Sequence, residues 1–168
     1  MNGVGLSVLA RQMDQWNEYI SRKKYVADVS KPKCILVDID GTLANHDGIR
    51  SPYEWDKVHL DTVHEHVKMI VNNLPDDISV IIMSGRDSVC RLATGEWLID
   101  NEIYHNDLFM RTEGDMRDDR EVKLEIFWRD IAPNYNCQFV IDDRPKIIRA
   151  WQEIGLKTFI VGNPYIEF

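Results

Sequence analysis

The sequence predicts an α/β fold in which a parallel sheet of about five strands is covered by helices on both faces. Short apolar runs alternate along the chain with longer segments in which apolar residues recur at helical spacing. Polar clusters directly follow three of these runs, where such sheets bind their ligands. With 168 residues, of which 44% are hydrophobic and 29% charged, one globular domain can bury a sizeable core.

The elements are expected in the following order. An amphipathic helix over residues 6–26 forms an N-terminal arm, residues 1–30, which we expect to pack on the main domain, residues 31–168. The apolar residues with helical spacing in this arm are Leu6, Leu9, Met13, Trp16 and Ile20. The predicted strands cover residues 34–39, 78–83, 107–110, 137–141 and 157–161. The predicted helices cover residues 57–73, 87–103, 118–131 and 145–154.

The net charge and the cysteine pattern limit the kinds of protein that this sequence can encode. The net charge of −8 argues against a protein that coats nucleic acid with a broad basic surface, but is compatible with binding to a single nucleic-acid end. The three cysteines form no C-x-x-C pair, so we expect buried, reduced thiols and a cytoplasmic location. The apolar stretch at residues 4–10 is too short for a membrane span, and we expect no export signal.

The first polar cluster is the run Asp38-Ile39-Asp40-Gly41-Thr42 at the end of the first predicted strand. Gly41 allows a sharp turn, and the strand separates two carboxylates by one residue. Two acids at a strand end need a counter-charge, and Mg²⁺ is the cation that prefers such hard oxygen ligands. A solvated turn is the alternative, since Asp and Gly are common turn residues.

This run resembles the first motif of the haloacid-dehalogenase (HAD) superfamily, most of whose members are phosphatases. Ser84, at the end of the predicted strand 78–83, is similar to the second motif. Lys123 is similar to the third motif, and Asp142-Asp143, after the predicted strand 137–141, is similar to the fourth. The resemblance implies a HAD-like, Rossmannoid three-layer sandwich.

A closer resemblance covers about residues 33–161 and is to the phosphatase domain of the bacteriophage polynucleotide kinase/phosphatase family. The segments that carry it are Pro52-Tyr53, Ser84-Gly85-Arg86-Asp87, Glu113-Gly114-Asp115-Met116-Arg117, Val122-Lys123, Glu125-Ile126-Phe127-Trp128, Ile131-Ala132-Pro133 and Ile141-Asp142-Asp143-Arg144. The match before Pro52 needs a one-residue gap within residues 48–51. The chain has no G-x-x-x-x-G-K-[ST] phosphate loop, so kinase activity is not implied.

The resemblance implies a role for each matching residue. Asp38 is expected to be the nucleophile that forms an aspartyl-phosphate, and Asp40 the general acid and base. Lys123 is expected to place a positive charge beside the phosphoryl group. Asp119, four residues earlier on a helix, is expected to orient the ammonium group of Lys123. Mg²⁺ is expected on Asp38, the main-chain carbonyl of Asp40, and Asp142 or Asp143. The expected phosphate- or substrate-binding residues are Thr42, Ser84, Gly85, Arg86, Arg50 and Asp119.

We therefore expect a Mg²⁺-dependent phosphomonoesterase that removes 3′-phosphates from nucleic-acid ends. The interval from residue 47 to 79 is too short for a large cap domain, so the end of a polymer could enter the active site. The alternatives are a phosphatase of free nucleotides and a non-catalytic module that binds phosphate or metal. The arm could contact a second copy of the chain or dock a separate kinase or ligase. The aromatic residues Phe127, Trp128 and Trp151 are expected in the core.

Overall fold

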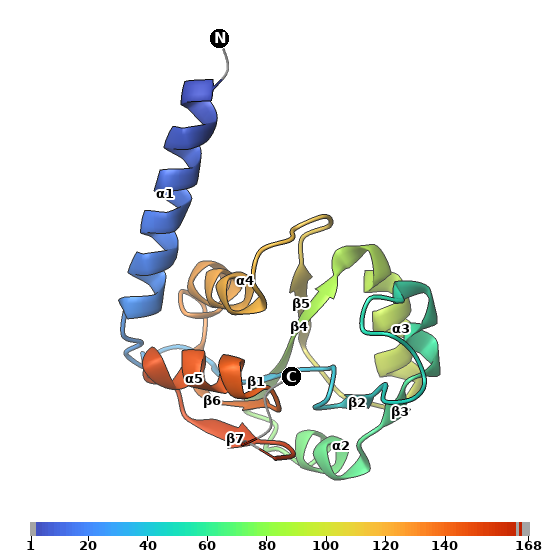
Figure 1. The fold of residues 1–168 in the computed structure, drawn as a ribbon. Coiled ribbons are helices and arrows are strands. Elements are labelled where there is room, and N and C mark those ends of the chain that lie inside the picture. The colour runs from blue at the N-terminus through green and yellow to red at the C-terminus, as the bar shows by residue number, and fades with distance from the viewer. Residues whose placement is uncertain (1–2, 164, 166–168) are drawn as a thin grey trace.

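The computed structural model describes residues 3–163 and 165, and its centre is a five-stranded parallel sheet (Figure 1). The strands are ordered β5-β4-β1-β6-β7, and every neighbouring pair is parallel. Their bounds are β1 Lys33–Val37, β4 Ile78–Asp87, β5 Asp107–Arg111, β6 Asn136–Asp142 and β7 Thr158–Ile160. The predicted parallel sheet is confirmed.

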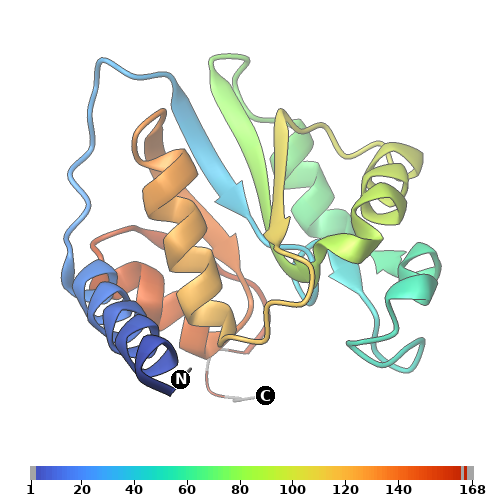
Figure 2. The same ribbon diagram turned by 90° about the horizontal axis from the view of Figure 1, so that it is seen from above.

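The helices lie on both faces of this sheet, as Figure 2 shows. The α-helices are α1 Gly3–Arg22, α2 Glu65–Asn72, α3 Arg91–Asp100, α4 Asp119–Ile126 and α5 Pro145–Glu153. Short 3-10 segments are η1 Trp55–Leu60 and η2 Ser88–Cys90, and α4 continues as a π-helical turn, η3 Phe127–Ile131. No helix in the described part of the chain combines the length and the apolar character that a membrane crossing requires.

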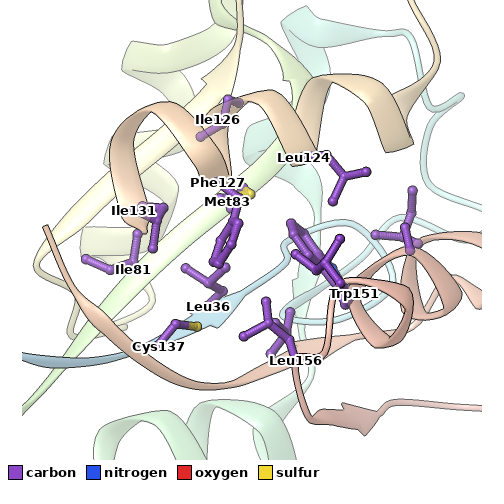
Figure 3. Packing of buried hydrophobic residues seen from close by; sticks show 14 of the residues in the cluster. Leu36, Ile81, Met83, Leu124, Ile126, Phe127, Ile131, Cys137, Trp151 and Leu156 are labelled. Carbon is purple, nitrogen blue, oxygen red and sulfur yellow. The ribbon is translucent and has the colours of Figure 1, made fainter. Parts of the chain in front are cut away.

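Successive side chains of the central strands point to opposite faces of the sheet, so the core has two layers. Leu36 of β1 and Met83 of β4 pack with Phe127 and Trp151 on the face that α4 and α5 cover (Figure 3). The intervening residue Val37 packs on the opposite face, with residues of α2 and α3. The three-layer α/β sandwich is therefore confirmed, and Phe127 and Trp151 are core residues, as predicted.

The N-terminal arm is helical, but α1 ends at Arg22 rather than at residue 26. After the helix, the backbone amide of Tyr25 donates to the carbonyl of Ile154, and the Tyr25 hydroxyl accepts from the amide of Cys137 at 2.8 Å. These hydrogen bonds hold Tyr25 against Ile154 and Cys137, so the chain leaves the helical path before this residue. Ile20 is buried in the core and Trp128 Nε1 donates to its carbonyl, whereas the start of α1 points away from the domain (Figure 1).

The helix predicted over residues 57–73 is wrong. The segment instead holds η1, a two-residue strand β3 (Thr62–Val63) and the short helix α2. Asp61 has extended backbone angles, and β3 pairs with β2 (Ala44–Asn45) in a small antiparallel sheet. Tertiary contacts of Asp61 prevent a continuous helix here. The Asp61 carboxylate is ion-paired in the interior, and the main-chain carbonyl of Asp61 accepts from Trp97 Nε1 at 2.9 Å.

One further difference and one agreement concern the segments around the site. β4 extends to Asp87, beyond the predicted end at residue 83, because its last residues still pair with β5. The insertion between β1 and β4 consists of β2, η1, β3 and α2. It adds only this two-stranded sheet and short helices, in agreement with the expected minimal cap.

Candidate active site

The carboxyl ends of three adjacent strands carry the polar side chains that the sequence analysis selected. Asp38 directly follows β1, Ser84 lies in β4, and Asp142 ends β6. The amide of Asp38 donates to the carbonyl of Ile141 at 3.0 Å, which joins the residue after β1 to β6. Since β1 lies between β4 and β6, these residues meet at one edge of the sheet, toward which the arrowheads in Figure 2 point.

Three buried carboxylates form a cluster at this edge. Asp38, Asp142 and Asp143 place ligand atoms within 4.8 Å of one another. Burial and the charges of Asp142 and Asp143 hold the pKa of Asp38 well above its usual value, despite the attraction of Lys123. Burial and Asp142 also raise the pKa of Asp143 to about 6. Carboxylates this close repel one another without a cation, and hard oxygen donors suit Mg²⁺, so these residues fit a magnesium site.

The turn after β1 fits closely around Asp143. Gly41 has φ +83°, and a Cβ atom there would lie 2.0 Å from Asp143 Oδ2, so any other residue would strain the backbone and displace that carboxylate. Thr42 Oγ1 donates to Asp143 Oδ1 at 3.1 Å, and Thr42 is fully buried. In the structure Thr42 therefore orients a carboxylate of the cluster, and its predicted contact with phosphate stays a prediction.

Lys123 provides the positive charge beside the cluster. Its Nζ lies 2.8 Å from Asp38 Oδ1 and 3.1 Å from Asp142 Oδ2, and the side chain is buried. Burial disfavours the charge, but Asp142, Asp38 and Asp119 together hold the pKa of Lys123 well above the ordinary lysine value. The ammonium group is therefore charged and contacts the carboxylate of Asp38, the predicted nucleophile.

Asp119 lies at the first turn of α4, behind Lys123. Its Oδ2 is 3.8 Å from Lys123 Nζ, the helical pairing that the sequence predicted. Its Oδ1 is 3.2 Å from Arg111 Nη2, and its Oδ2 is 3.6 Å from Arg144 Nη1. A Cβ atom on Gly85 would lie 2.2 Å from Asp119 Oδ1. Because Gly85 has no side chain, the Asp119 carboxylate can lie beside it.

Two arginines hold the carboxylate of Asp40. Arg86 donates from Nε to Oδ2 at 2.9 Å and from Nη2 to Oδ1 at 2.7 Å, and Arg50 Nη2 donates to Oδ1 at 2.8 Å. Burial raises the pKa of Asp40, but the bonds and charges of Arg86 and Arg50 outweigh it and lower the pKa below its usual value. These contacts favour the carboxylate form of Asp40, the form that acts as a base.

Asp61 completes this arrangement, and the sequence analysis missed it. Its carboxylate accepts from Arg50 Nε at 2.7 Å and from Arg86 Nη2 at 2.6 Å. The side chains of Asp61, Arg50 and Arg86 have no exposed surface. Nothing in the sequence distinguishes Asp61 from a helix surface residue, because its partners are Arg50 and Arg86, eleven and twenty-five positions away.

Both guanidinium groups bind the carboxylates of Asp40 and Asp61. The expected contact of Arg86 and Arg50 with a substrate phosphate stays a prediction. Two acids near the interior need counter-charges, and the planar guanidinium group supplies paired bonds that a lysine lacks. Ser84 is also buried, and its Oγ accepts from the amide of Arg86 at 3.2 Å.

A pocket of about 510 Å³ opens over these residues. Asp38, Asp40, Lys123 and Asp143 line its floor together with Arg86. Further lining residues come from the loop after β2 and the start of η1, from the end of β5 and the loop after it, and from α5; they include His46, Tyr53, Trp55, Arg111, Met116, Arg117 and Lys146. The carboxylate of Asp38, the ammonium group of Lys123, carboxylates suited to a cation and the carboxylate of Asp40 thus border one cavity, an arrangement that phosphoryl transfer could use.

Comparisons with known proteins point to the same chemistry. A family model described as the phosphatase domain of polynucleotide kinase PNKP, of HAD type, matches residues 32–164. A putative bifunctional polynucleotide kinase/RNA ligase of Autographa californica nuclear polyhedrosis virus is 36% identical over 144 residues. That match covers 82% of this chain and 20% of the viral protein.

Two solved structures show the same fold. A chain in a structure of the Pnkp1/Rnl/Hen1 complex matches with a TM-score of 0.78 and 32% identity, over 83% of this chain and 49% of that one. A chain in a structure of the Pnkp1/Rnl/Hen1 RNA repair complex matches with a TM-score of 0.80 and 31% identity, over 87% of this chain and 47% of that one. This chain thus spans about half the length of the solved chains and a fifth of the viral relative.

Proposed function

Because this chain belongs to the HAD-type family of polynucleotide kinase phosphatase domains, we propose that it removes 3′-phosphates from nucleic-acid ends through an aspartyl-phosphate on Asp38. The observation that carries the proposal is the contact of Asp38 with Lys123, next to the carboxylates of Asp142 and Asp143 and within reach of the pocket. The proposed cofactor is Mg²⁺, held by Asp38, the main-chain carbonyl of Asp40, and Asp142 or Asp143. It would neutralise the negative charge of the nucleophile and the phosphate.

In the first proposed step, an oxygen of Asp38 attacks phosphorus. A bond forms between that oxygen and phosphorus, and the bond between phosphorus and the 3′-oxygen breaks. Asp40 gives its proton to the departing 3′-oxygen, and Lys123 lies beside the phosphoryl oxygens as they gain charge. Asp40 must be protonated at this point, although Arg86 and Arg50 lower its pKa. The negative charge of a bound phosphate raises that pKa again.

In the second proposed step, Asp40 acts as the base. It takes a proton from a water molecule, whose oxygen attacks the phosphorus of the aspartyl-phosphate, so that inorganic phosphate leaves and the Asp38 carboxylate is restored. The contacts with Arg86 and Arg50 favour the ionised form that this step needs. Together the two arginines fix Asp40 near the nucleophile that lies two residues before it.

The proposed substrate follows from the shape of the site and from its relatives. The insertion between β1 and β4 adds only short elements, so the pocket of about 510 Å³ is open to a polymer end. The viral relative is described as a polynucleotide kinase/RNA ligase, and one solved relative belongs to an RNA repair complex. The free cysteines Cys34, Cys90 and Cys137 are all buried, which supports the proposed cytoplasmic location.

The substrate proposal can be tested by comparing rates side by side. We expect release of phosphate from 3′-phosphorylated RNA or DNA oligonucleotides at a kcat/KM at least about tenfold above that for nucleoside monophosphates, since more of the polymer contacts the protein. Chelation with EDTA should abolish the release, and added Mg²⁺ should restore it. Higher kcat/KM for free nucleotides would support the nucleotide phosphatase instead, and a rate that survives chelation would contradict the metal site.

The proposed partner is a kinase or RNA ligase that acts on the same ends. Helix α1 lies before the region that the family model matches, and it exposes Met13, Trp16 and Tyr19, with the rings of Trp16 and Tyr19 5.8 Å apart. The viral relative is described as a putative bifunctional polynucleotide kinase/RNA ligase, and the solved relative belongs to a Pnkp1/Rnl/Hen1 complex, which favours such a partner over a second copy of this chain. We expect light scattering to give the mass of a monomer. A dimer that dissociates on Trp16→Ala would contradict this assignment.

A further inference from the structure

Two large apolar side chains are exposed within the charged pocket. Tyr53 lies in the loop between β2 and η1 and is 79% exposed, and Met116 lies in the loop between β5 and α4 and is 93% exposed. Both line the pocket that contains Asp38. The two loops are far apart in the sequence, so the fold brings these side chains to one cavity.

Trp55 supports the ring of Tyr53 from the side. The two ring centroids are 6.0 Å apart and the ring planes meet at 85°, an edge-on arrangement. Trp55 itself is only partly exposed and packs against the core layer of α2 and α3. The high exposure of Tyr53 leaves its ring accessible to a ligand, while Trp55 restricts its movement.

The charged side chains at the pocket mouth are largely engaged with each other. Arg111 contacts Asp119, Arg117 contacts Asp115 and Glu125, and Lys146 contacts Asp118. These pairs neutralise much of the positive charge that a run of phosphates would need. Scattered exposed apolar residues are normal on a protein surface, but two of them over a catalytic pocket are suited to a flat, uncharged group.

We propose that Tyr53, backed by Trp55, and Met116 form a nucleobase subsite that holds the base of the nucleotide carrying the 3′-phosphate. This inference rests on the proposed function and deepens it. The base stacks on the ring of Tyr53, and the flexible thioether of Met116 contacts the same base. Because every base has a π-face, such a subsite accepts all four nucleotides and distinguishes nucleic-acid ends from phosphate esters that lack a base.

The test combines a protein change with a substrate change. Wild type and Tyr53→Ala are compared on two 3′-phosphorylated oligonucleotides that differ only in the terminal nucleotide, which has its base in one and is abasic in the other. For wild type we expect kcat/KM to be about tenfold or more lower on the abasic end, the effect of one lost base stack. In Tyr53→Ala we expect the two ends to differ by less than about threefold, because the stacking partner is gone.

Two further variants complete the design. Tyr53→Phe keeps the ring and should retain the preference for the end with a base. Tyr104 is exposed on the surface outside the residues that line the pocket, and Tyr104→Ala should behave as wild type on both ends.

The outcomes separate the inference from the function on which it rests. If Tyr53→Ala lowers kcat/KM equally on both ends, or on neither, the nucleobase subsite is overturned while the 3′-phosphatase stands. If wild type hydrolyses an aryl phosphate but releases no phosphate from either oligonucleotide, the proposed function fails and the subsite fails with it.

Discussion

Asp38→Asn should lower the rate of Mg²⁺-dependent phosphate release by a factor of about 10⁴ or more. The amide lacks the charge and nucleophilicity of the carboxylate, so no aspartyl-phosphate can form. The change also removes a negative charge from the cluster with Asp142 and Asp143 and from the ion pair of 2.8 Å with Lys123 Nζ. The measurement is phosphate release from a 3′-phosphorylated oligonucleotide and from an aryl phosphate at saturating Mg²⁺.

The matched control for this variant is Asp100→Asn. Asp100 is exposed at the end of α3, away from the residues that line the pocket, so this change should leave the rate unaltered. Urea unfolding of Asp38→Asn should remain cooperative, which separates lost chemistry from lost folding. A wild-type rate in Asp38→Asn would remove Asp38 as the nucleophile.

Asp61→Ala should lower both the free energy of unfolding and the catalytic rate. The change leaves Arg50 and Arg86, whose side chains have no exposed surface, with Asp40 as their shared carboxylate partner. Breaking a buried ion pair in this way costs about 3–5 kcal/mol. Because the same two arginines hold Asp40, we also expect kcat to fall by a factor of about 10². The measurements are urea unfolding and steady-state kinetics.

Two variants give this prediction its controls. Asp61→Asn keeps the shape and one acceptor oxygen, so its loss of stability should be smaller than that of Asp61→Ala. Asp76 is exposed in the turn before β4, and Asp76→Ala should leave the unfolding curve unchanged. If Asp61→Ala were as stable and as active as Asp76→Ala, the network would have no role in holding Asp40.

Much of this architecture could be predicted from the sequence, because local pattern and chain order determine it. Apolar runs mark the strands, and in a parallel sheet their carboxyl ends must meet, so Asp38, Ser84 and Asp142 could be placed together before any coordinates. The cluster of Asp38, Asp142 and Asp143 and the contact of Lys123 with Asp38 are arranged as that reasoning requires. Their catalytic and metal-binding roles remain the prediction that experiments must test.

The features that could not be predicted depend on contacts between distant residues. The segment of residues 57–73 has helical spacing, but the ion pairs of Asp61 with Arg50 and Arg86 break the helix, and the sequence does not reveal that pairing. The sequence likewise does not reveal that the guanidinium of Arg86 binds Asp40 and Asp61. Both contacts depend on tertiary charge pairing, which local propensity does not indicate.

The most direct test of the proposed mechanism is to trap the phosphate on the protein. The protein is mixed with a 3′-phosphorylated oligonucleotide and Mg²⁺, quenched in acid within the first turnover, digested, and the phosphorylated peptide is identified by mass spectrometry. We predict phosphate on Asp38 in wild type and no phosphopeptide in Asp38→Asn. Phosphate on a different residue, or rapid hydrolysis of the oligonucleotide with no phosphorylated protein at any quench time, would contradict an aspartyl-phosphate on Asp38.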